Sequence, residues 1–356
     1  MNTIKRFYAL DAFRGLAALL VFLFHTPQLS VLTHSAFIRG SGYFVDLFFV
    51  LSGFVIYHNY KDKLSTISSS KPFIIKRIKR LIPLHVYTLL VLLLLEFIKY
   101  ATSNQITYST VPFETNTITS FWPQFFLLNS TPLFYGFNWN GPSWSISAEI
   151  ITYFLFIITS LVCFRKKRWT LLISFAIVCL GYLFFSLKDH TYNITIDYKY
   201  SFIRGFIGFY FGIIIYLLRG ILLNVFNKAS KMTGNLFEVL ILIIIAYIIC
   251  HVGYFKNYFF IIHIAFGLLI LVFSMEKGII SNLLKLQIFQ KLGQWSYSIY
   301  LNHTLMIILY NMILIKGFGI NDNYILLSEI LLIILVCAYS SFTYKHIEKR
   351  YYSKIK

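Results

Sequence analysis

Arg14 and His25 lie eleven residues apart in one apolar run, LDAFRGLAALLVFLFHT, where ionisable side chains are costly. Each residue of an α-helix turns by about 100°, so this step leaves the two side chains only about 20° apart on the helix surface. The rise over the same step is roughly 16 Å. Asp11 falls on the same face, about 40° from His25. A guanidinium that grips anions and an imidazole that accepts protons near pH 7 therefore share one stripe of one predicted helix.

The same stripe has an explanation without chemistry. Asp11 and Arg14 would pair at the membrane interface, and the ring of His25 would turn outward to reach water. Further ionisable residues in other apolar runs favour a functional site over this alternative. They are Asp46 in GYFVDLFFVLSGFVI, Glu149 in WSISAEI, Arg204 at the start of a later run and His303 in YSIYLNH.

Asp46 and Glu149 are the candidate partners of His25, since each is predicted to lie in the outer half of a membrane helix. A carboxylate beside an imidazole orients the ring and stabilises its protonated form, as in a serine-hydrolase triad. The sequence favours neither carboxylate over the other. His303 is predicted nearer the middle of the membrane, where a single histidine is more often a hydrogen-bonded packing residue than a catalyst.

Arg77 and Arg80 lie in the basic stretch FIIKRIKRLIP, three residues apart and therefore on one helical face. Guanidinium groups bind phosphate oxygens in pairs, so the two residues are candidates for holding a phosphorylated cofactor. The alternative is a basic flank that only orients the following helix in the membrane.

The composition indicates that membrane helices position these residues. The chain has 356 residues, of which 58% are hydrophobic and 13% charged, and its mean hydropathy is +0.71. A soluble domain of this length needs more polar residues to cover its surface. The net charge of +19 does not indicate nucleic acid, because the basic residues lie mainly in short connections, where they orient helices and meet anionic lipid. The four cysteines show no metal-binding spacing, so no metal site is expected.

The apolar runs predict an all-α polytopic membrane protein with about ten transmembrane helices, each near the length that crosses a bilayer. The predicted spans are 10–27, 42–59, 82–99, 144–163, 170–187, 201–218, 236–252, 257–274, 296–315 and 324–343.

The distribution of Lys and Arg predicts the orientation of these helices. Of the 32 basic residues, 24 lie in one set of alternate connections and only six in the opposite set. Because cytoplasmic loops carry the excess of Lys and Arg, both termini are predicted to be cytoplasmic. Residues 1–356 are expected to form a single integral-membrane domain without a fused extracytoplasmic domain.

In the segments that carry these residues, the sequence resembles the acyltransferase family 3 membrane proteins, which O-acylate carbohydrates and other acceptors outside the cytoplasm. The matching segments are LDAFRGLAALLVFLFHT with its Arg-x10-His pair, GYFVDLFFVLSGFVI, FIIKRIKRLIP, WSISAEI and LGQWSYSIYLNH. They occur in the family's order and extend from residue 10 to about 303. The combination is far more specific than the Arg-x10-His pair alone.

The resemblance implies that Arg14 and His25 are the essential pair, that Arg77 and Arg80 form the basic motif, and that Glu149 matches an acidic position. It implies transfer of an acyl group, with acetyl the expected one, from cytoplasmic acyl-CoA to a hydroxyl of an extracytoplasmic carbohydrate or surface polysaccharide. Acyl-CoA would then be a co-substrate that is not permanently bound. His25 would act as a general base or would accept the acyl group itself.

A bacterial plasma membrane is the expected location, with membrane lipid, a carbohydrate or lipid-linked saccharide and polysaccharide assembly proteins as expected partners. A transporter or flippase of a lipid-linked saccharide is the alternative, because ionisable residues near the membrane midplane also line transport paths. A structural subunit of a polysaccharide assembly complex is a third interpretation.

Overall fold

The computed structural model describes residues 6–105, 110–133, 138–189, 200–228, 230–255, 259–319 and 322–352. These parts of the chain are helical, with short connections and no β-strand. The helices are α1 (Tyr8–His25), α2 (Val31–His34), α3 (Ala36–Gly40), α4 (Phe44–Tyr60), α5 (Ile67–Thr102), α6 (Ile118–Phe125), α7 (Trp144–Val162), α8 (Lys167–Asp189), α9 (Ser201–Lys228), α10 (Lys231–Cys250), α11 (Val252–Phe255), α12 (Phe260–Phe273), α13 (Ile279–Leu284), α14 (Gln287–Tyr310), α15 (Ile325–Thr343) and α16 (Lys349–Tyr352).

The number of membrane helices agrees with the prediction. Within the described ranges, nine helical stretches are long and apolar enough to cross a membrane, and α12 is a shorter apolar helix of 14 residues. Residues 257 and 258, at the start of the span predicted at 257–274, lie outside the described residues. The chain is thus an all-α polytopic membrane protein, as its composition indicated.

The largest difference from the predicted boundaries concerns α5. It begins at Ile67 and has 36 residues, which corresponds to a length of about 54 Å. The hydrocarbon core of a bilayer is only about 30 Å thick, so α5 continues well beyond it. A capping box formed by Thr66 and Ser69 starts the helix, and the basic stretch continues it without a break. Arg77 and Arg80 therefore lie on a helix that is continuous with the membrane span.

Close crossings bring α1 against α14 and α4 against α9. A Cβ atom on Gly15 would lie 2.4 Å from the backbone carbon of Leu292, and one on Gly293 would lie 2.3 Å from the carbonyl oxygen of Asp11. Such distances admit only glycine, as is usual where membrane helices approach closely. The polar stripe of α1 is thereby held against α14.

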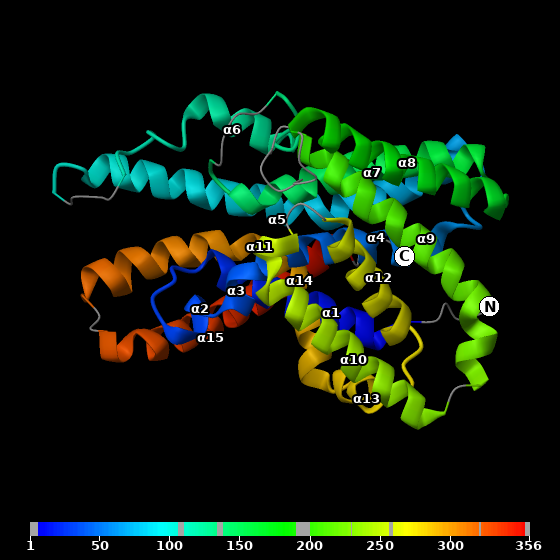
Figure 1. Ribbon diagram of the computed structural model, residues 1–356. Coiled ribbons are helices and arrows are strands. Elements are labelled where there is room, and N and C mark those ends of the chain that lie inside the picture. The colour runs from blue at the N-terminus through cyan, green and yellow to red at the C-terminus, as the bar shows by residue number, and fades with distance from the viewer. Residues whose placement is uncertain are drawn as a thin grey trace.

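α6 and Trp139 pack against the part of α5 that contains Leu89 and Leu92 (Figure 1). Asn140, just before a 3-10 turn at Gly141–Ser143, is fully buried. Its side-chain amide donates hydrogen bonds to Thr88 on α5 and to the carbonyl of Leu301 on α14, at 3.2 and 3.0 Å. These bonds link the residues just before α7 to both α5 and α14.

Candidate functional site

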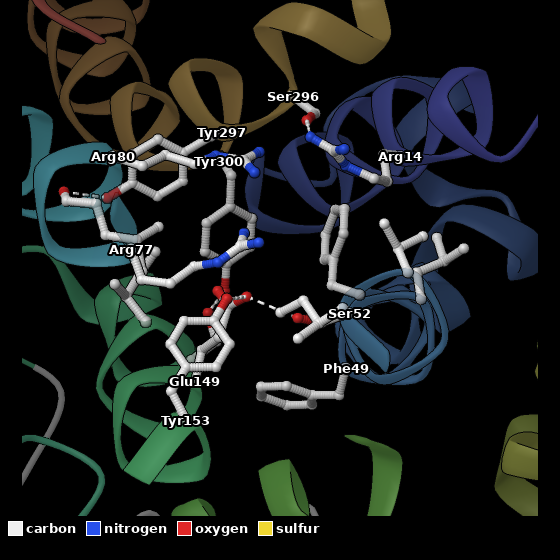
Figure 2. Close-up of a pocket in the computed structure, with 17 residues that line it drawn as sticks. Arg14, Phe49, Ser52, Arg77, Arg80, Glu149, Tyr153, Ser296, Tyr297 and Tyr300 are labelled. Atoms are coloured by element: carbon white, nitrogen blue, oxygen red, sulfur yellow. Dashed lines mark hydrogen bonds between the residues drawn. The ribbon is translucent and has the colours of Figure 1, made fainter. Parts of the chain in front are cut away.

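A pocket inside the bundle brings together residues that are far apart in the sequence (Figure 2). We call it the arginine pocket. Its walls come from α1, α4, α5, α7 and α14. Its polar lining residues are Arg14, Ser52, Arg77, Arg80, Ser145, Glu149, Tyr153, Ser296, Tyr297 and Tyr300, with apolar residues of α4, α5 and α7 completing the wall. Three predicted anion-binding arginines and one predicted carboxylate thus share a single cavity.

Arg77 is held in the pocket by aromatic rings. Its guanidinium carbon lies 5.6 Å from the ring centroids of Tyr60, Phe73 and Tyr153. Cation–π attraction of this kind holds a guanidinium in place without using its N–H donors. The buried Nε of Arg77 has no hydrogen-bond partner among the described residues. The side chain is therefore fixed in position and retains a donor for an anionic ligand.

Arg14 enters the same pocket from α1 (Figure 2). One terminal nitrogen donates to the Ser296 hydroxyl on α14 at 3.2 Å, and the other lies 3.4 Å from Asp11. Asp11 also accepts a shorter bond, 2.7 Å, from Arg6. Each guanidinium uses its own oxygen of Asp11, and the longer distance to Arg14 makes that contact the weaker of the two.

A second cavity adjoins the arginine pocket and shares Arg14 and Arg80 with it. Its remaining charged lining residues are Arg6, Asp11, Glu348 and Lys349. They come from the start of α1 and from the C-terminal helical turns, which the charge bias predicts to be cytoplasmic. We call this end of the bundle the basic end. Arg14 and Arg80 therefore stand between the cavity at the basic end and the arginine pocket in the interior, and line both.

Glu149 lies on the wall of the pocket opposite α1. Its carboxylate accepts hydrogen bonds from the Ser52 hydroxyl, at 2.9 Å, and from the Tyr153 hydroxyl one turn along α7. Ser52 belongs to the segment SGF of α4, so two of the sequence motifs meet at this carboxylate. Glu149 balances part of the positive charge in the pocket and fixes Tyr153, which in turn packs on Arg77.

Tyr300 and Phe48 form the wall of the pocket that faces the opposite end of the bundle. Their ring centroids are 5.7 Å apart. The Tyr300 hydroxyl donates to the carbonyl of Pro142 and accepts a bond from Ser145, each at 2.9 Å. The Tyr300 ring also contacts His303, with centroids again 5.7 Å apart. Tyr300 therefore touches both the arginine pocket and His303.

His25 and His303 meet beyond this wall. Their ring centroids are 5.0 Å apart, with 32° between the ring planes. Nδ1 of His25 lies 2.8 Å from the carbonyl oxygen of Val21, which only accepts hydrogen bonds, so Nδ1 is the donor and the neutral ring has its lone pair at Nε2. His25 is exposed, whereas His303 lies buried behind it with no hydrogen-bond partner of normal geometry at either ring nitrogen among the described residues.

Neither candidate carboxylate lies in this histidine pair. Both oxygens of Asp46 accept hydrogen bonds from Arg204, at 2.7 and 2.5 Å, and the side chain is fully buried. Glu149 bonds to Ser52 and Tyr153, as described above. The hydrogen bond of His25 within the described residues goes to the backbone of its own helix. The expectation that a carboxylate orients the His25 ring therefore does not match the hydrogen bonds of the structure, because Asp46 pairs with Arg204 and Glu149 bonds to Ser52 of α4 and Tyr153 of α7.

Several residues of the site had no signal in the sequence. Tyr153, Tyr297 and Tyr300 line the pocket, but aromatic residues make up 19% of the chain and no spacing distinguishes these three. His303 was recognisable as an ionisable residue in a motif, although its contact with His25 was not. In the part of the chain that the structure describes, no three His, Cys, Asp or Glu side chains are grouped as a metal site.

Comparison with known proteins shows which family the sequence matches. A family model described as an acyltransferase domain matches residues 7–344. The chain is also 43% identical over 89 residues to a protein of Rhizobium radiobacter named "Protein 2 in picA locus". That alignment covers 24% of this chain and 43% of the relative, so the chain matches less than half of the relative's length. No solved structure gives a significant match.

Proposed function

Because the chain belongs to the acyltransferase family whose model covers residues 7–344, we propose that this multi-pass membrane protein moves an acyl group from cytoplasmic acyl-CoA to a hydroxyl on the other side of the membrane. The observation that carries the proposal is the arginine pocket, which joins Arg14, Arg77 and Arg80 and continues to the basic end. Acetyl is the proposed group, and a carbohydrate or surface polysaccharide is the proposed acceptor.

The donor enters from the basic end. Arg14 and Arg80, at the junction of the two cavities, bind the phosphates of the donor, and Arg77 adds its unpaired Nε–H. The thioester arm then extends along the pocket toward Tyr300. Arg14 and His25 lie roughly 16 Å apart along α1, a length that an extended pantetheine arm spans. The aromatic wall must move for the thioester to pass, and Phe48 and Tyr300 are the side chains that gate it.

The transfer occurs at His25, which is exposed at the outer end of α1. Nε2 takes the proton of the acceptor hydroxyl, and the hydroxyl oxygen attacks the thioester carbonyl carbon. The carbon–sulfur bond breaks, and the imidazolium returns its proton to the departing thiolate. His303 provides the second polar ring beside the reacting groups and supports the orientation of His25. The products are the O-acylated acceptor and free CoA.

The test is transfer of label from radiolabelled acetyl-CoA to surface polysaccharide in membranes that contain the protein. The wild-type protein is expected to label the acceptor, and His25→Ala at the same protein level is expected to abolish labelling. Full labelling with His25→Ala would refute the catalytic role of His25. Transport of a lipid-linked saccharide without any transfer of label would refute the enzyme assignment and support the transporter alternative.

A further inference from the structure

A separate polar cavity lies at the basic end among α4, α7, α8 and α9, and it shares no lining residue with the arginine pocket. We call it the α8 cavity. Its cationic lining residues are Lys61, Arg165 and Lys167, and its acidic lining residue is Asp62. Lys61 is engaged with Tyr216, whose hydroxyl accepts a 3.0 Å hydrogen bond from its ammonium group. Arg165 and Lys167 are exposed at the connection between α7 and α8, which leaves an excess of positive charge at the rim.

The interior of the α8 cavity is lined by hydroxyl groups. Ser174, on α8, is only 1% exposed, and its hydroxyl oxygen has no hydrogen-bond partner among the described residues. Leaving a buried polar group unpaired costs about 1–3 kcal/mol, so such groups commonly face a ligand or water. Across the cavity the hydroxyls of Thr159 and Tyr210 bond to each other at 2.9 Å. A ligand with hydroxyl groups of its own matches this lining.

The position of the cavity indicates where the ligand comes from. α7 ends at Val162 and α8 begins at Lys167, so the connection between them lies where these apolar helices leave the membrane. Trp169, in the first turn of α8, is 58% exposed, as is typical of a tryptophan at the membrane–water interface. Further along α8 the exposed side chains are large and apolar, for example Phe175 and Leu180. One wall of the α8 cavity therefore belongs to a helix that faces lipid.

We propose that the α8 cavity binds the headgroup of an anionic phospholipid that carries hydroxyl groups, such as a glycerol headgroup. The phosphate lies between Arg165 and Lys167, the headgroup hydroxyls reach Ser174 and Thr159, and the acyl chains run along the apolar face of α8. Basic residues at the membrane surface attract anionic lipid in general. The α8 cavity adds selection, because its buried hydroxyl lining fits a hydroxylated headgroup and not a choline. This site is independent of the proposed acyl transfer.

The test measures lipid retention by the full-length protein in detergent, using native mass spectrometry during titration with phosphatidylglycerol or phosphatidylcholine. One tightly bound phosphatidylglycerol is expected, with at least tenfold weaker binding of phosphatidylcholine. Lys167→Ala is expected to weaken phosphatidylglycerol binding about tenfold, which corresponds to the loss of one charge-assisted hydrogen bond. Ser174→Leu fills the cavity without changing charge and is expected to abolish the selectivity between the two lipids.

Arg168→Ala is the matched control, since Arg168 is exposed on the same turn of α8 but does not line the cavity. If Arg168→Ala weakens binding as much as Lys167→Ala, only surface charge attracts the lipid and the proposal fails. Competition by glycerol 3-phosphate at the same concentration as the lipid would assign the site to a soluble phosphate and also overturn the proposal. Size-exclusion profiles identify any variant that is misfolded. If Ser174→Leu does not fold, Lys167→Ala still decides the test, because Lys167 is at an exposed position.

Discussion

Replacing Arg77 by Gln tests how the arginine pocket holds its ligand. The substitution removes the charge and the unpaired Nε–H while leaving a side chain that fits among the rings of Tyr60, Phe73 and Tyr153. A hydrogen bond to a charged group contributes about 1.5–3 kcal/mol, and each 1.4 kcal/mol corresponds to a factor of about ten. We therefore expect kcat/KM for acyl-CoA to fall about 10- to 100-fold.

Arg77→Lys is the informative companion variant. Lysine keeps the charge but presents a point charge in place of a planar fork, and it loses most of the stacking on the three rings. Its kcat/KM should lie between the value of the wild type and the value of Arg77→Gln. The control is Lys79→Gln, because Lys79 is exposed two residues further along α5 and does not line the pocket.

The assay is the initial rate of acyl transfer as a function of acyl-CoA concentration, in membranes adjusted to equal amounts of protein. Binding of the donor by Arg77 predicts a raised KM for acyl-CoA with Arg77→Gln and an unchanged KM with Lys79→Gln. Equal effects in the two variants would indicate that α5 supplies only a basic flank. An unchanged KM with Arg77→Gln would refute the reasoning directly.

Three further predictions concern the rest of the site and its support. Asp46→Asn leaves the buried Arg204 without its carboxylate, so we expect a loss of about 3–5 kcal/mol of stability, measured as a lower thermal unfolding midpoint in detergent. Gly53→Ala would put a Cβ atom 1.8 Å from the carbonyl oxygen of Phe209, so α4 and α9 must separate and the yield of folded protein should fall sharply. His303→Phe keeps a ring but removes both nitrogens, and we expect the transfer rate to fall about tenfold, or about 1.4 kcal/mol, with an unchanged KM for acyl-CoA.

Matched substitutions check the first two expectations, and the transfer rate itself decides the third. Asp62→Asn, at an exposed position after α4, should leave the unfolding midpoint unchanged, and an equal decrease in both variants would contradict the importance of the buried pair. Gly220→Ala should be tolerated, because a Cβ atom there has open space around it. If His303→Phe transfers acyl groups at the wild-type rate, His303 is a packing residue only.

The polar stripe of α1 was predictable because it depends on one helix alone. Arg14 donates to Ser296, and His25 packs on His303, so both ends of the stripe face the same neighbour, α14. The family assignment was also predictable, since the ordered motifs carry it and the family model confirms it. Both predictions rest on the spacing and order of residues along the chain, which the sequence contains in full.

The partners of the charged residues were not predictable in the same way. Asp46 pairs with Arg204, 158 positions further along the chain, and helical periodicity contains no information about which distant charge meets which. The continuity of α5 from Ile67 into the span predicted at 82–99 was not predictable from hydropathy either. A window of hydropathy ends where charged residues begin, whereas helical hydrogen bonding continues through Lys and Arg, which are good helix formers. The tyrosines of the pocket belong to a residue type that is common throughout the chain.

The most direct test of the account uses sealed vesicles that contain the protein in one orientation, with labelled acetyl-CoA and the carbohydrate acceptor on opposite sides. With acetyl-CoA supplied only at the basic end, we expect label to appear on the acceptor across the membrane. We expect His25→Ala to abolish this transfer. Transfer only when donor and acceptor share one side of the membrane would contradict a path that leads from the arginine pocket past Tyr300 to His25.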